Sequence, residues 1–189
     1  MKKILFFFAG LLITTISIPA QNTVDFKLQE NSNFINVLDG KSYSVITYDG
    51  KSQSELYSMI LTSITKLYNS PKDVISKVEN EIISVNGICT DYVIVKTPGM
   101  KMHFAFKYIL KFQFKDGKVR IDAPIVSQMI SQYEPSSYTK PFQDWVNSWK
   151  IFKNGTVNPK RQDTANYLNN KLNSLINNIL SSHALNDEW

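Results

Sequence analysis

Histidine, the side chain that most often transfers protons in catalysis, occurs only twice in the 189 residues, as His103 and His183. A Ser-His-Asp hydrolase would depend on one of them, and no serine lies in a G-x-S-x-G turn. Carboxylates such as Glu79, Glu81 and Asp91 could act as a glycosidase acid and base, but spacing alone does not select a pair. We therefore predict no catalytic residues and a non-enzymatic protein, with an undetected hydrolase as one alternative.

Motifs for metals and cofactors are missing from the sequence as well. It contains no H-E-x-x-H, no cysteine pair, no calcium-binding loop, no Walker loop and no G-x-G-x-x-G. We therefore predict no metal site and no cofactor. The formal net charge of +5 is too small to predict nucleic-acid binding.

The main candidate for a binding site is a set of cationic side chains on one side of the segment 103–115. Even positions there carry aromatic or leucine side chains, and odd positions include Lys107, Lys111 and Lys115, which predicts a strand with two different faces. The aromatic face should pack against a helix, and the lysine face could contact an envelope protein or an anionic surface polymer. Lysines on a sheet also keep a protein soluble, so a purely structural face covered by the C-terminal helix is the other alternative. The predicted binding residues are Lys101, His103, Lys107, Lys111 and Lys115.

The N-terminus has the pattern of a secretory signal peptide. Lys2 and Lys3 precede an apolar run of about 15 residues, shorter than the ~20 that span a bilayer, and Ala20 offers a cleavage site before Gln21. A lipoprotein would need a cysteine directly after that site, whereas the only cysteine is Cys89. We predict export to the periplasm or beyond the cell, no lipid anchor and no membrane span after cleavage.

The rest of the chain predicts an α+β fold. A β-branched and aromatic run, 43–48, precedes the turn Asp49-Gly50, and a capping box of Ser52 and Glu55 then begins an amphipathic helix that ends before Pro71. Consecutive antiparallel strands follow to about residue 130, with Gly87 predicting a bulge or bend. The helix should pack on one face of this sheet. The predicted segments are a signal peptide 1–20, an N-terminal arm 21–39, an α+β domain 40–130 and a helical C-terminal extension 131–189.

The extension carries its own pattern. Trp145 and Trp149 lie four residues apart on one helical face, where they could either dock the extension or bind a sugar or protein. The final helix has an apolar stripe that includes Leu168, Leu172 and Ile176, and its other face is mostly asparagine and serine. Such a helix gains little from ion pairs, so we expect it to dock on another element.

The middle of the chain resembles a known family. The segments are "DGKSQSELYSMILTSITKLY", "DVISKVENEIISVNGICTDYVI" and "FKYILKFQFKDGKVRIDAPIV", which together span roughly residues 40–130. They are similar to a secreted bacterial family, domain of unknown function 4468, whose fold is like that of the TATA-binding protein. The resemblance implies a helix packed on an antiparallel sheet and export in Gram-negative bacteria. It carries over no site residues, and a shared fold does not imply DNA binding.

Overall fold

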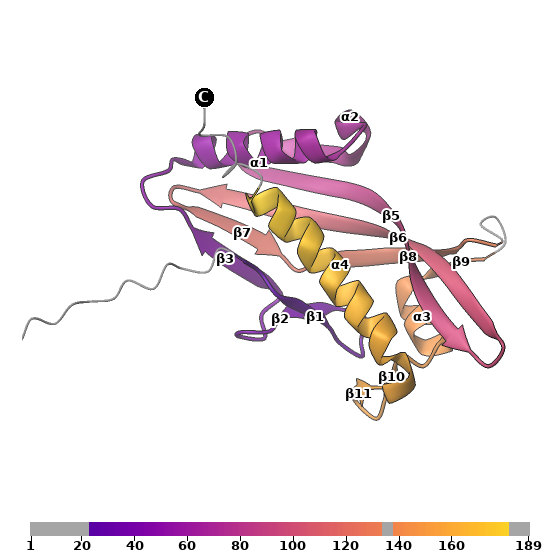
Figure 1. The fold of residues 1–189 in the computed structure, drawn as a ribbon. Coiled ribbons are helices and arrows are strands. Elements are labelled where there is room, and N and C mark those ends of the chain that lie inside the picture. Colours follow the sequence, from indigo (N-terminus) through magenta and orange to yellow (C-terminus); the bar gives the residue numbers. More distant parts are fainter. Residues whose placement is uncertain (1–22, 134–137, 182–189) are drawn as a thin grey trace, which may run out of the picture.

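The structure is a computed structural model that describes residues 23–133 and 138–181. Figure 1 shows a twisted antiparallel sheet with the helices α1 and α4 on the same side of it. In chain order the elements are β1 Phe26–Leu28, β2 Phe34–Asn36, β3 Tyr43–Thr47, α1 Gln53–Leu67, α2 Pro71–Val74, β4 Ile75–Val78, β5 Ile82–Thr97, β6 Met100–Lys115, β7 Lys118–Asp122, β8 Ile125–Ser131, β9 Thr139–Pro141, α3 Phe142–Ser148, β10 Phe152–Lys153, β11 Thr156–Val157, the 3-10 helix η1 Pro159–Arg161 and α4 Gln162–Ser181. The predicted α+β class, with an antiparallel sheet and a C-terminal helix, is confirmed.

The long strand β6 organises the main sheet. Strands run in the order β3-β7-β6-β5-β4, and β8 pairs with the first half of β6 while β7 pairs with its end. β9 adds to β8 at the edge. Every pairing is antiparallel. Residues directly opposite each other in these ladders share a face, so the register assigns each strand residue to one side of the sheet.

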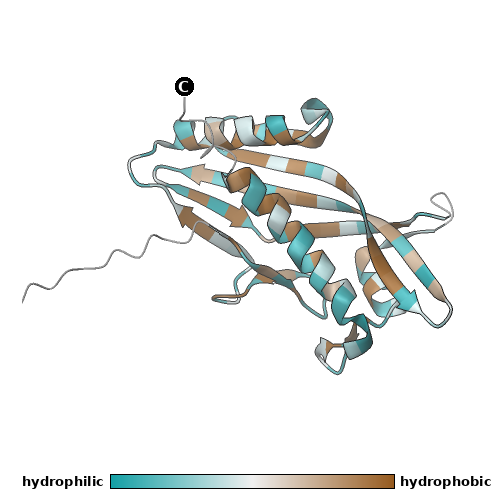
Figure 2. Ribbon diagram, in the orientation of Figure 1, coloured by the Kyte–Doolittle hydropathy of each residue, from teal (hydrophilic) through white to brown (hydrophobic). Residues whose placement is uncertain are grey.

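The aromatic face of β6 forms the core, as its alternation predicts. Phe104, Phe106, Phe112 and Leu110 are fully buried, and Tyr108 is 3% exposed. Figure 2 shows hydrophobic and hydrophilic residues alternating along the strands of the sheet. Because α1 contacts β5, β6 and β7, this is the face that the first helix covers.

The start of α1 follows the prediction. The Ser52 hydroxyl oxygen accepts a hydrogen bond from the Glu55 amide at 3.3 Å, and the Ser52 amide donates to the Glu55 carboxylate at 2.8 Å. In addition, the Gln53 amide donates to the Asp116 carboxylate at 2.8 Å, which joins the helix to the turn between β6 and β7. The helix ends at Leu67 with Tyr68 as its C-cap, before Pro71.

The glycine in β5 has a different role from the predicted bulge. The register shift in the β5–β6 ladder lies between Cys89 and Val93, not at Gly87. A Cβ atom on Gly87 would lie 2.3 Å from a ring carbon of Tyr108, its cross-strand partner. The missing side chain lets the Tyr108 ring cross β5, so that its hydroxyl meets the Tyr68 hydroxyl at 2.9 Å. Gly87 is therefore explained by close packing.

The C-terminal extension is helical only in part, since it also contains β9 and the small β10–β11 hairpin. Trp145 is fully buried, and the rings of Trp145 and Trp149 both meet the ring of Phe104 at centroid distances of 5.6 Å. Of the two roles open for these tryptophans, the structure shows docking. They attach α3 to the far end of the aromatic face.

The described residues of the segment predicted as an N-terminal arm, 23–39, form secondary structure. Among the described residues, β1 and β2 form a hairpin whose side chains Phe26, Leu28 and Phe34 are buried. The hairpin lies beside α4 (Figure 1). The prediction underestimated this segment because its partner is a helix some 140 residues later in the chain.

An asparagine ladder joins β1 to α4. The side-chain oxygens of Asn169, Asn173 and Asn177 accept hydrogen bonds, at 2.8 to 2.9 Å, from the backbone amides of alternate residues of the segment 24–28. Two strand residues advance ~6.6 Å and four helix residues ~6.0 Å, so the two periods nearly match. The neutral face of α4 thus satisfies the backbone of an edge strand.

Candidate functional site

The predicted binding residues lie on the side of the sheet that faces away from α1 and α4, which we call the open face. The register assigns to it the odd-numbered residues of β6 with their partners on β5, β7 and β8. No helix in residues 23–133 and 138–181 crosses this side of the sheet (Figure 1). Of the predicted residues, Lys101, Lys107 and Lys115 are exposed, whereas His103 and Lys111 are half-buried.

The alternative in which the C-terminal helix covers the lysine face is wrong. Helix α4 packs on the aromatic side, where Leu168 and Leu172 join the core. It also meets the edge of β5, because the Thr164 hydroxyl donates to the carbonyl of Ile94 at 2.9 Å and the Tyr167 hydroxyl donates to that of Asp91 at 2.7 Å. The apolar stripe of the helix packs on the aromatic face, because the lysine side of β6 presents no matching apolar stripe.

The predicted residues share a face but do not form one cluster. From Lys101 to Lys115 the strand advances about 46 Å at ~3.3 Å per residue. Lys101 lies opposite Lys96, Lys107 lies opposite Ile88, and Lys115 lies opposite Lys118. The positive charge is therefore spread along the open face, with a pair of adjacent lysines near each end.

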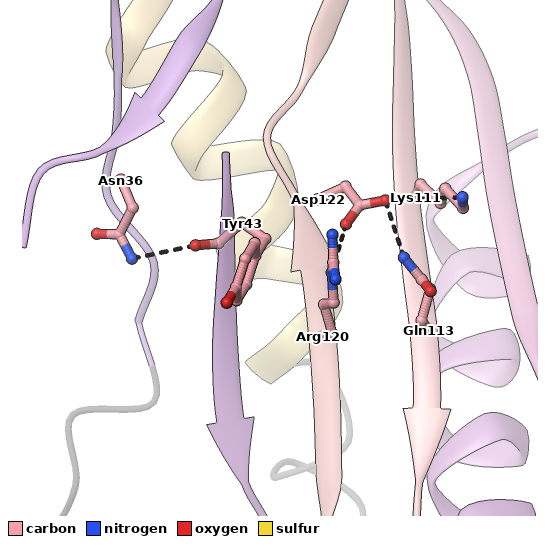
Figure 3. Close-up of polar contacts among 6 residues, drawn as sticks. All are labelled: Asn36, Tyr43, Lys111, Gln113, Arg120 and Asp122. Carbon is pink, nitrogen blue, oxygen red and sulfur yellow. Dashed lines mark hydrogen bonds and ion pairs between the residues drawn. The ribbon is translucent and has the colours of Figure 1, made fainter. Parts of the chain in front are cut away.

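One carboxylate, that of Asp122, sits among the cations at the β7 side of the open face. It accepts hydrogen bonds from Arg120 Nε at 2.8 Å and Gln113 Nε2 at 2.9 Å, and it lies 3.7 Å from Lys111 Nζ. Figure 3 shows these side chains, with the guanidinium of Arg120 beside the ring of Tyr43. Lys111 is thus partly neutralised, unlike the exposed Lys107 and Lys115.

The open face also carries exposed aliphatic residues, which the sequence reasoning missed. They are spread over β3, β4, β5 and β8, and a signal was present, because both alternating sets of the segment 82–95 contain isoleucine or valine. A surface that mixes branched aliphatics with lysines differs from an ordinary solvated sheet face. The exposed fractions are 47% for Val45, 52% for Val78, 55% for Ile88, 39% for Ile94 and 57% for Ile125.

The surroundings of His103 are aromatic. Its ring lies 6.0 Å from that of Tyr92 and 6.1 Å from that of Tyr133. The carboxylate of Asp91, one residue before Tyr92, pairs with Lys171 of α4. Among the described residues, no three His, Cys, Asp or Glu side chains are grouped so that they could hold a metal ion.

A further structural finding concerns membranes. Within residues 23–133 and 138–181, no helix is both long enough and apolar enough to span a bilayer. The longest, α4, has 20 residues and carries asparagine along one side.

Comparisons with known proteins agree with this architecture. A TBP-like protein from Parabacteroides distasonis ATCC 8503 has a similar structure, with a TM-score of 0.53 and 16% identity over 76% of this chain and 91% of that one. A DUF4468 family protein from Bacteroides ovatus ATCC 8483 gives a TM-score of 0.54 and 10% identity over 78% of this chain and 87% of that one. At these identities the likeness shows the fold alone, and no curated protein matches the sequence.

The family model that matches the sequence is the domain of unknown function DUF4468 with TBP-like fold, over residues 43–126. This span runs from the start of β3 into β8 and contains α1 and the whole of β6. It lies within the range 40–130 over which the resemblance was noted. The segment 43–126, which includes β3 to β7 and the first helix, therefore matches the DUF4468 family model, and the fold is TBP-like.

Proposed function

We propose that this protein is an exported, non-enzymatic module of the cell envelope that binds an acidic partner protein through the open face. The observation that carries the proposal is that lysines and exposed aliphatic side chains lie together on a sheet face that no described helix covers (Figure 1). The signal-like N-terminus supports export. The aromatic surroundings of His103 support a binding rather than a catalytic role.

The positive charge on the open face indicates the sign of the charge on the partner. Lys107 is exposed in the middle of the face, and the lysine pairs Lys96–Lys101 and Lys115–Lys118 lie toward its ends. Asp122 and Asp163 neutralise only their own neighbours. A complementary surface would therefore be acidic, and charge complementarity would raise the rate of association at low salt.

The aliphatic residues favour a protein over a polymer. Ile88 lies beside Lys107 in the ladder and is 55% exposed, and Ile125 is 57% exposed opposite Ile109. A charged glycan would bury little apolar surface there, whereas a protein interface has an apolar centre with a polar rim. A second copy of the chain fits less well, because a two-fold contact would oppose lysines to lysines.

Site-specific photo-crosslinking in the cells that produce the protein would test this. A photoreactive residue replaces Ile88 in one variant and Lys107 in another, and Lys66 on the exposed side of α1 serves as the matched control position. We expect adducts with one protein from positions 88 and 107 but not from position 66. Because the steering is electrostatic, about 0.5 M salt during crosslinking of the extract should reduce the yield.

Confirmation requires purified components. The captured protein should bind the purified chain, and Ile88→Glu should weaken that binding at least tenfold, because it places a carboxylate in an apolar and acidic contact. Equal adducts from all three positions, or an adduct that resists protease and consists of glycan, would refute an acidic protein partner.

A further inference from the structure

A hollow of about 590 Å³ lies at the end of the open face, next to the turn between β6 and β7. Its volume is within the ~300–1,000 Å³ range of small-ligand sites. Its lining residues come from β3, β7 and the ends of β5 and β6, which are neighbours in the sheet, and from the start of α1. The lining residues are Tyr43, Val45, Gln53, Glu81, Ile82, Gln113, Phe114, Lys115, Lys118 and Arg120.

Arg120 is held in place at this hollow. Its guanidinium carbon lies 4.1 Å from the centroid of the Tyr43 ring, and its Nε donates to Asp122 at 2.8 Å (Figure 3). Stacking and the Nε bond together fix the plane of the guanidinium. Within the described part of the chain the hydrogen bond of Arg120 uses Nε, which leaves its two terminal nitrogens as a preoriented pair of donors.

Two lysines add charge at the same place. Lys115 and Lys118 lie directly opposite each other across the hairpin, an arrangement of like charges that costs stability. Within residues 23–133 and 138–181 neither of them makes an ion pair. Glu81 is the one carboxylate among the lining residues, against the two lysines, and Arg120 is already paired with Asp122. The remaining excess of charge is positive. An anionic ligand would offset this excess.

The apolar residues of the lining indicate that the anionic ligand also carries an apolar organic group. Val45 is 47% exposed on β3, and Ile82 is half-buried on β5. We infer that the hollow binds a phosphate monoester, with the phosphate between Arg120 and the two lysines and the organic group against Val45 and Ile82. A dianion with three terminal oxygens can engage a bidentate guanidinium and two ammonium groups together, whereas a carboxylate has only two oxygens. This site goes beyond the proposed function, because its ligand is small and binds at one end of the face.

Calorimetric titration of the mature protein with phenyl phosphate, inorganic phosphate and benzoate would test the inference. We expect phenyl phosphate to bind at least roughly tenfold more tightly than the other two, since only it offers both parts. Arg120→Lys should weaken phenyl phosphate at least about tenfold by removing the bidentate donor, and Lys118→Gln should weaken it less. Lys107→Gln, on the same face outside the hollow, is the matched control and should leave binding unchanged.

A second experiment, with lipid vesicles, distinguishes a lipid headgroup from a soluble phosphate ester. If the protein binds phosphatidylcholine vesicles that contain phosphatidic acid, and Arg120→Lys abolishes this binding, the ligand is a lipid headgroup. If it ignores these vesicles yet binds phenyl phosphate, the ligand is a soluble ester. Both results support the site. Phenyl phosphate binding no more tightly than benzoate, or weakened equally by Lys107→Gln and Arg120→Lys, would overturn it.

Failure here can be told apart from failure of the proposed function. Ile88→Glu should leave phenyl phosphate binding unchanged, and Arg120→Lys should leave the crosslink from position 88 in place. Because Ile88 lies in the middle of the open face and Arg120 lies at one end of it, each variant reports on a different part of the face, and either proposal can fail alone.

Discussion

The two faces of the central sheet are formed by the same strands but differ in burial and composition. Phe112 on the aromatic face of β6 is fully buried, whereas Ile88, which lies on the open face of the neighbouring strand, is 55% exposed. Helices α1 and α4, the tryptophans of the extension and the β1–β2 hairpin all gather on the aromatic face. Stability is therefore concentrated on one side of the sheet, and the composition of the other is free to serve binding.

The largest expected effect compares one residue from each face. Phe112→Ala should destabilise the protein by about 3–5 kcal/mol, because it opens a cavity beneath α1. Ile88→Ala should change the free energy of unfolding by no more than about 0.5 kcal/mol. Urea denaturation of the two variants measures both values. Equal losses would mean that the open face is buried in solution, which would refute the division between the faces.

Gly87→Ala tests how tightly the aromatic face is packed against β5. The added Cβ would lie 2.3 Å from the Tyr108 ring, so the ring must move and the contact of its hydroxyl with Tyr68 must change. We expect a loss of about 1–3 kcal/mol by thermal or urea unfolding. The double variant Gly87→Ala with Tyr108→Leu should lose less than the two single changes combined, because the leucine has no ring to clash. Additive losses would contradict the proposed close approach.

The asparagine ladder between α4 and β1 lies on the aromatic side of the sheet. Breaking it should lower stability less than the changes in the core. Asn173→Ala removes the acceptor of the Phe26 amide, 2.8 Å away, and the donor to the Phe26 carbonyl. We expect a loss of about 1–2 kcal/mol and faster amide exchange at Phe26. Asn170→Ala, at an exposed position of the same helix, is the control and should have little effect on either measurement. Unchanged exchange at Phe26 in the Asn173 variant would contradict the ladder.

Alkaline pH should weaken the aromatic side through its paired tyrosines. Burial raises the pKa of Tyr108 above its usual 10.0, and burial also raises the pKa of Tyr68. The folded state therefore holds these two protons more tightly than the unfolded state, so their contribution to stability is fully present below pH 10 and is lost as the pH rises above it. Each such group contributes a slope of up to about 1.4 kcal/mol per pH unit.

Tyr108→Phe is the variant that isolates this dependence. It should reduce the alkaline slope of the parent protein in a series of urea titrations from pH 8 to 11. A parent protein equally stable across this range, or an unchanged slope in the Tyr108 variant, would contradict the assignment.

The fold on the aromatic side was predictable because local patterns agreed with the long-range packing. The alternation of β6 and the capping box of Ser52 and Glu55 each fix a structure by themselves, and the structure contains both. The asparagines of α4 gave no such signal, because an asparagine face is equally compatible with solvent. Their role depends on β1 lying alongside with a matching repeat, which no single segment encodes.

The candidate site was predictable only in part. Alternation correctly placed Lys101, Lys107, Lys111 and Lys115 on one face of the sheet. It could not predict that α4 packs on the opposite face. Nor could it bring Arg120 and Tyr43 together, since β3 and β7 are some 75 residues apart and adjacent only in the sheet. The exposed isoleucines of the open face were missed for a simpler reason. In sequence, an outward isoleucine in a strand looks the same as an inward one.

The last expected effect on stability is small and concerns Asp122, the acid that pairs with Arg120 and Lys111 on the open face. Asp122→Asn removes its ion pairs with Arg120 and Lys111, which are partly exposed, so the loss should stay below about 1 kcal/mol. The same change releases two cations, and the protein should therefore elute from a heparin column at higher salt than the parent. Asp163→Asn, which frees Lys96 on the same face, is the matched control for a change of charge elsewhere. An equal shift in both variants would mean that heparin senses only net charge. A larger shift for Asp122→Asn would show that the β7 side of the open face is where its positive charge acts.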